Sequence, residues 1–71
     1  MVTRRLVDYH ISRLQDKNRD VRLKSIEELR LIGDYAAMDA LEQIFKNDVD
    51  PDVRKAAADA GLEIHKKNRQ P

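Results

Sequence analysis

Three aspartates, spaced two residues apart, are the side chains best arranged to do chemistry. Asp48, Asp50 and Asp52 stand in the stretch DVDPDVR with the spacing of the first three calcium ligands of an EF-hand loop. Val53 occupies the position where such a loop needs a sharp-turn glycine, and Asp59 the position of its bidentate glutamate. We therefore interpret the aspartates as helix-capping residues and expect no metal site.

Histidine and serine side chains offer no better start for catalysis. His10 and His65 have no second histidine at ligand spacing, and the chain contains no cysteine. Ser12 and Ser25 have no neighbouring base in the sequence, and no motif predicts an oxyanion pocket. We expect no catalytic residue and no cofactor, so the sequence predicts that the protein is not an enzyme.

Basic residues gather in the first third of the chain, although the whole chain is nearly neutral. Fourteen Lys and Arg stand against thirteen Asp and Glu, for a formal charge of +1. The seven basic residues of this stretch are Arg4, Arg5, Arg13, Lys17, Arg19, Arg22 and Lys24. Phosphate contact by these residues is one hypothesis, but two tyrosines and one phenylalanine provide no stacking platform. Nucleic-acid binding therefore stays an alternative, and a solvated face is the more usual meaning.

Helical periodicity organises the chain that carries these residues. Apolar residues recur at helical spacing in four segments, and we expect helices that end near Gln15, Gly33, Asn47 and Lys66. Thr3, either Asn18 or Asp20, Asp34 and Asp50 are the expected caps. Pro51 suits the first position of the last helix, where its missing amide costs nothing.

The second and fourth helical segments repeat each other. At an offset of 32 residues, Asp20-Val21-Arg22 falls on Asp52-Val53-Arg54 and Ile32 falls on Ile64. The first and third segments align better at an offset of 30. A repeat of about 30 residues carried by helix pairs is typical of an α-solenoid.

At these residues the chain resembles the short HEAT-like repeats related to the phycobilisome-lyase (PBS lyase) family. The family pattern D-x-D-x-x-V-R, leading into an Ala-rich helix, stands here as DVDPDVRKAAADAGLEI and, less faithfully, as DKNRDVRLKSIEELRLIG. The resemblance implies a scaffold or adaptor rather than a catalyst. It also implies that Asp and Arg of the turn pair between neighbouring repeats, which carries over to Asp20, Arg22, Asp52 and Arg54.

The repeat alignment also predicts a contact surface. Ala58 aligns with Ile26, which would face the following repeat, so Ala58 and Leu62 should face the place where a third repeat is missing. Small residues there allow close approach of another helix, from a second copy or from another protein. Tyr9 is a further candidate partner contact, because exposed tyrosines are favoured in interfaces. Arg4 and Arg5 are candidates because the positive charge of the first third could steer a partner.

Together these observations predict an all-α fold: a minimal four-helix α-solenoid made of two HEAT-like helical hairpins. We expect one domain over 1–71, with repeat one at about 4–33, repeat two at about 34–66 and a frayed tail at 67–71. The expected function is a cytoplasmic, non-catalytic protein–protein interaction module without a signal peptide or membrane span. The alternatives are a nucleic-acid-associated accessory protein, an auxiliary to a phycobilisome or tetrapyrrole lyase-type system, and a self-associating structural unit.

Overall fold

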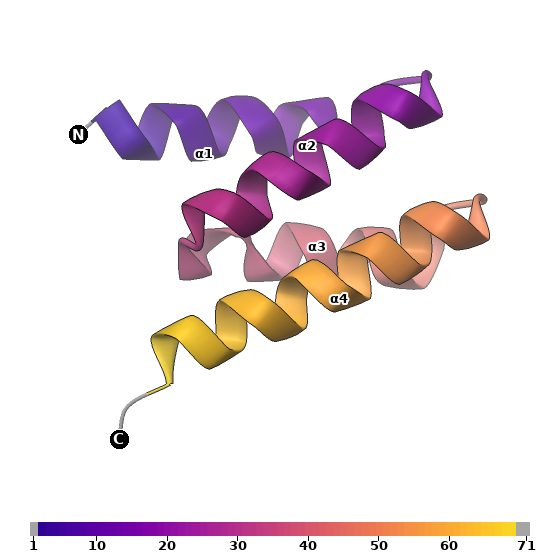
Figure 1. The fold of residues 1–71 in the computed structure, drawn as a ribbon. Coiled ribbons are helices and arrows are strands. Elements are labelled where there is room, and N and C mark those ends of the chain that lie inside the picture. Colours follow the sequence, from indigo (N-terminus) through magenta and orange to yellow (C-terminus); the bar gives the residue numbers. More distant parts are fainter. Residues whose placement is uncertain (1, 70–71) are drawn as a thin grey trace.

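Helices account for nearly all of residues 2–69, the part of the chain that the computed structural model describes (Figure 1). In chain order they are α1 (Val2–Arg13), α2 (Arg19–Ile32), the 3-10 helix η1 (Tyr35–Ala37), α3 (Met38–Asn47) and α4 (Pro51–Asn68). The described residues contain no strand. The predicted all-α class is confirmed.

Capping side chains begin the helices largely where the sequence placed them. Asn18 accepts a hydrogen bond from the amide of Asp20 at 2.8 Å, and Asp50 accepts from the amides of Asp52 and Val53 at 2.8 and 3.3 Å. These side chains satisfy amides that have no partner inside the helix. The prediction that Thr3 caps the first helix is wrong, because α1 begins at Val2 and already includes Thr3.

The helix ends differ from expectation in two places, since α1 ends at Arg13 and not near Gln15, and α4 extends beyond Lys66. Gly33 ends α2 as predicted, with a left-handed φ of 73° that glycine adopts without steric cost. α4 continues through Lys67 and Asn68 instead of ending at Lys66. The side-chain amide of Asn68 explains this extension, because it donates to the carbonyls of Ile64 and Gly33 at 2.8 and 3.0 Å.

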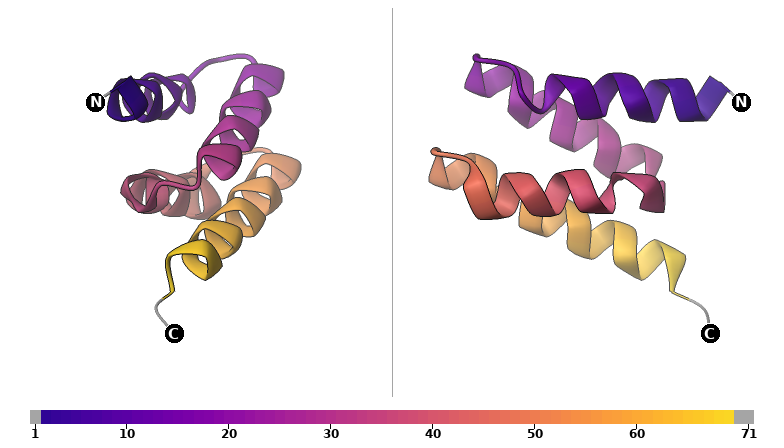
Figure 2. Two further views of the ribbon diagram at one scale, coloured as in Figure 1. Left: turned by 60° about the vertical axis from the view of Figure 1, so that its left-hand side comes forward. Right: turned by 180° about the vertical axis from the view of Figure 1, so that it is seen from behind.

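The two helical hairpins stack side by side in two layers. α1 and α3 form one layer and α2 and α4 the other, as Figure 2 shows, and α2 contacts both α1 and α4. Both turns within the hairpins lie at the same end of the molecule (Figure 1). The Cα atoms span 35 × 25 × 16 Å. Because there are only two hairpins in the stack, each hairpin covers one face of the other and leaves its own opposite face open.

Apolar side chains from every α-helix meet between the layers. The buried hydrophobic residues are Val7, Leu14, Ile26, Leu29, Ala37, Leu41, Ile44, Val53, Ala57, Ala60 and Ile64. They follow the predicted helical stripes, since residues three or four apart share one face of a helix. Phe45 of α3 is apolar but lies outside this core, since 50% of it is exposed.

A nearly buried ion pair joins the two hairpins near their turns. Arg22 of α2 approaches Asp48 with Nε 2.9 Å from Oδ2, without the alignment of a hydrogen bond, while its Nη2 donates to Oδ1 at 3.2 Å. The side chains are only 12% and 6% exposed. Arg22 also donates to the carbonyls of Asp16 and Lys17. One guanidinium thereby fixes the first turn and the second turn together.

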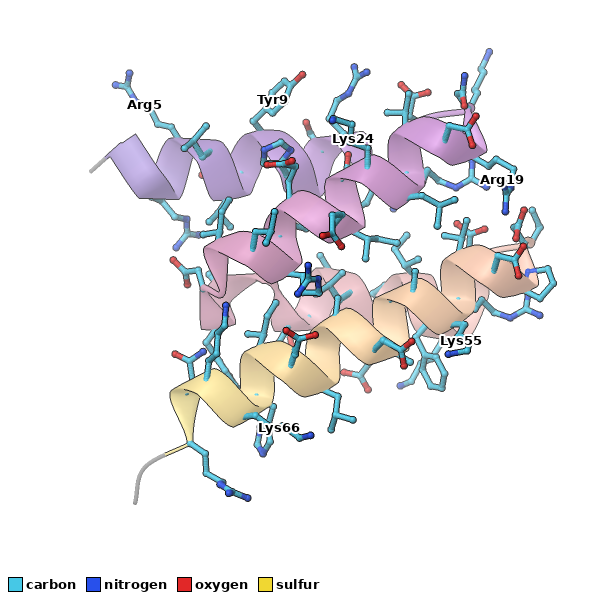
Figure 3. The ribbon with its side chains drawn as sticks, in the orientation of Figure 1. Arg5, Tyr9, Arg19, Lys24, Lys55 and Lys66 are labelled. Atoms are coloured by element: carbon cyan, nitrogen blue, oxygen red, sulfur yellow. The ribbon has the colours of Figure 1, made fainter. Side chains whose placement is uncertain are left out.

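Of the four residues predicted to form Asp–Arg pairs, only Arg22 and Asp52 pair between the hairpins, each with another partner. Asp52 binds Arg19 at 3.1 Å, not Arg22. Asp20 reaches only Arg19 of its own helix, at 3.6 Å. Arg54 donates to the carbonyl oxygen of Asp48 within its own hairpin at 2.6 Å. Arg19 connects the two hairpins because it is the first residue of α2 and points toward the start of α4, as Figure 3 shows.

Asp50 carries the clearest pH dependence of this network. The hydrogen bond from Arg19 and, to a lesser degree, the amides of Asp52 and Val53 lower the pKa of Asp50 from 3.8 to about 2. A carboxyl group with a lowered pKa in the folded state stabilises the fold above its unfolded pKa, and that contribution disappears as pH falls through the folded pKa. The affected range therefore lies between about pH 4 and pH 2.

We expect Asp50→Asn to weaken this acid response. Asparagine is a good helix cap, so the substitution removes the charge paired with Arg19 and keeps an acceptor for the first turn of α4. The melting temperature should be lower than that of the wild type at neutral pH and should fall less between pH 4 and pH 2. Circular dichroism melts across that range measure this, and parallel curves for the two proteins would contradict the prediction.

Candidate functional site

An apolar groove of about 450 Å³ runs between α3 and α4 on the face of the second hairpin that points away from the first. Leu41, Ala57 and Gly61 form its buried floor, together with the partly exposed Met38 and Ala58. We call this surface the α3/α4 groove. It lies on the open face that the stacking of the two hairpins leaves uncovered.

The hollow exists because two positions that carry large residues in the first repeat carry small ones in the second. Ile26 and Leu29 of α2 are 2% and 0% exposed core residues. At the 32-residue offset they correspond to Ala58 and Gly61 of α4. A Cβ atom at Gly61 would lie 3.8 Å from Cε of Met38, which is ordinary van der Waals contact. The small residues therefore reflect an unfilled space rather than a steric requirement.

Three large apolar side chains stand around this hollow. Tyr35, Phe45 and Leu62 line the groove and are 53%, 50% and 57% exposed. Single exposed apolar residues are ordinary on protein surfaces, but a group of them around one recess is typical of a contact site. Aromatic side chains are also among the residues enriched in protein–protein interfaces.

Charged residues lie in and beside the groove. Asp39 and Glu42 line it from α3. On α4, Lys55 and Lys66 stand seven residues before and four residues after Leu62, which puts them on the same side of the helix as that residue. Figure 3 shows both lysines projecting away from the first hairpin. Neither lysine lines the groove, so the carboxylates of α3 are the acidic part of its lining.

Intrahelical partners hold part of this charge. Glu42 pairs with Lys46 at 3.1 Å and Lys55 pairs with Asp59 at 3.0 Å, all with exposed side chains. Exposed pairs of this kind contribute little to stability and exchange readily with solvent or other charges. These groups can therefore rearrange around a bound partner.

The structure separates the five predicted partner contacts into two groups. Ala58 and Leu62 both line the α3/α4 groove. Arg4, Arg5 and Tyr9 belong to α1, and Figure 3 shows Arg5 and Tyr9 projecting from the opposite side of the molecule. Arg4 pairs with Asp8 of its own helix at 3.1 Å. The α1 residues therefore do not form one surface with the groove.

Phe45 is a groove residue that the sequence-based prediction missed, and Tyr35 was not among the five predicted partner contacts. The repeat alignment contains the signal that could have identified them. At the 30-residue offset they replace Arg5 and Gln15, and at the 32-residue offset Leu62 replaces Arg30. Three positions that are polar in the first repeat are thus large and apolar in the second. This difference identifies the face of the second repeat that exposes apolar side chains.

The aspartate run makes structural contacts within the fold. Asp48 faces Arg22, while Asp50 caps α4 and, like Asp52, binds Arg19. Within the described part of the chain, no three His, Cys, Asp or Glu residues are grouped so that they could hold a metal ion. Structural ion pairing accounts for the spacing that resembled a calcium loop.

A second cleft of about 540 Å³ lies beside the two turns. Leu14 and Ile44 contribute apolar surface there, and Gln15, Gln43 and Asn47 contribute polar groups. Gln43 already accepts a hydrogen bond from Asn47 at 3.1 Å. The α3/α4 groove is the better candidate for a protein contact because its exposed apolar side chains surround one recess.

None of the helices in the described residues combines the length and the apolar character needed to cross a bilayer.

Comparison with known families identifies the class of protein that this fold represents. The family model described as HEAT repeats matches residues 2–60, which is most of the chain. The chain therefore belongs to the HEAT repeat family, and its stacked hairpins are an all-α, solenoid-like arrangement of that family. HEAT repeats are commonly protein-interaction modules and are typically non-catalytic. No curated protein and no solved structure matches the chain.

Proposed function

We propose that this chain is a small non-catalytic adaptor or accessory subunit that docks on another protein through the α3/α4 groove. The observation that carries the proposal is the group of three large, half-exposed apolar side chains around one hollow, formed by Tyr35, Phe45 and Leu62. Burial of such side chains at an interface is worth about 25 cal/mol per Å² of apolar area removed from water. The cysteine-free composition fits a protein that works in the reducing cytoplasm.

The outer face of the first hairpin is a weaker candidate for a docking surface than the α3/α4 groove. Figure 3 shows Arg5, Tyr9 and Lys24 projecting from that face, and all three side chains are exposed. Charged and amphipathic side chains of this kind are stable in water without a partner. The first hairpin also exposes Leu6 and Leu31, but neither lines the α3/α4 groove, where three such side chains surround one recess.

Ion pairing makes nucleic-acid binding the weaker proposal. Arg4 and Arg13 pair with Asp8 and Asp16 at 3.1 and 3.7 Å. Arg19 and Arg22 bind aspartates of the second hairpin. Four of the seven basic residues in the first third are thus held by carboxylates, which reduces the charge available for phosphate contacts.

We expect Leu62→Asp to abolish partner binding and to leave the fold intact. A carboxylate at the centre of the groove would be buried without a partner in any complex, which is strongly unfavourable. In the free protein Leu62 is 57% exposed, so its substitution should change stability by no more than about 1 kcal/mol. Affinity capture from lysate of the source cells, performed with nuclease, measures retention, and circular dichroism measures folding.

Leu31→Asp is the matched control for this experiment. Leu31 is also 57% exposed and also lies on a helix, but it is outside the groove. A set of proteins retained by the wild type and by Leu31→Asp, and lost with Leu62→Asp, would support the proposal. Equal retention by all three proteins, or retention that disappears with nuclease, would contradict it. Unfolding of Leu62→Asp alone would show that Leu62 is a core residue.

A further inference from the structure

We draw no further inference here: the strongest candidate, the uncovered apolar face of the second hairpin around the α3/α4 groove, is the docking surface already proposed, and nothing in the structure shows what covers it.

Discussion

Replacing Arg22 by methionine should cost about 3–5 kcal/mol of folding free energy, because it leaves the buried carboxylate of Asp48 without its counter-charge. The Asp48 side chain is only 6% exposed, so water cannot replace the guanidinium. A folded chain of 71 residues has a total stability of about 4–11 kcal/mol at the usual value per residue. The variant should therefore be partly unfolded, which urea titration followed by circular dichroism measures.

Arg54→Met is the matched control, because Arg54 occupies the equivalent position of the second repeat. Arg54 donates to the carbonyl oxygen of Asp48 and has no ion pair within the described residues. Its loss removes one charge-assisted hydrogen bond and should cost about 1.5 kcal/mol. Equal losses for the two variants would contradict the importance of the buried carboxylate.

A second substitution tests the cause directly. Asp48→Asn, added to Arg22→Met, removes the unpaired charge and keeps an oxygen that can accept from the amide of Asp50, as Asp48 does at 3.0 Å. The double variant should be more stable than Arg22→Met alone. A further loss of stability would show that Arg22 acts through its hydrogen bonds to the first turn instead.

Leu29→Ala should cost about 2–5 kcal/mol, the range for truncating a fully buried leucine. Leu29 is 0% exposed and sits in α2, the helix that contacts both α1 and α4. The cavity would lie where the two layers meet, and a core of this size has few side chains that could fill it. The midpoint of urea unfolding should move to much lower urea concentration.

The control for this variant lies two residues along the same helix. Leu31 is 57% exposed, so Leu31→Ala should change the free energy of unfolding by less than about 0.5 kcal/mol. Similar losses for both substitutions would indicate that helix propensity, and not burial, determines the stability of α2. Leucine and alanine are both good helix formers, so propensity alone predicts little change.

Much of the fold could be predicted from local patterns. Gly33, Asn18 and Asp50 act through backbone groups within four residues, so their roles can be read from neighbouring positions. The failures concern interactions with distant residues. The end of α4 moved because Asn68 reaches the carbonyl of Gly33, and 35 positions separate the two residues.

The candidate site could be predicted only in part for the same reason. Ala58 and Leu62 were identified because the repeat alignment compares equivalent positions. Phe45 has apolar neighbours on its own helix, and only the packed structure shows that it is half-exposed and lines the groove. Helix periodicity describes one helix and contains no information about how far its neighbour extends over it.

The sequence by itself determined the helices, their caps and the repeat, because hydrogen bonds and apolar contacts three or four residues apart specify them. Only the tertiary structure decided which charges meet. Arg19, and not Arg22, binds Asp52, because guanidinium and carboxylate pair according to the distance between helix ends brought together by stacking. The groove has the same origin: its hollow, its three exposed apolar side chains and its two carboxylates come from separate helices.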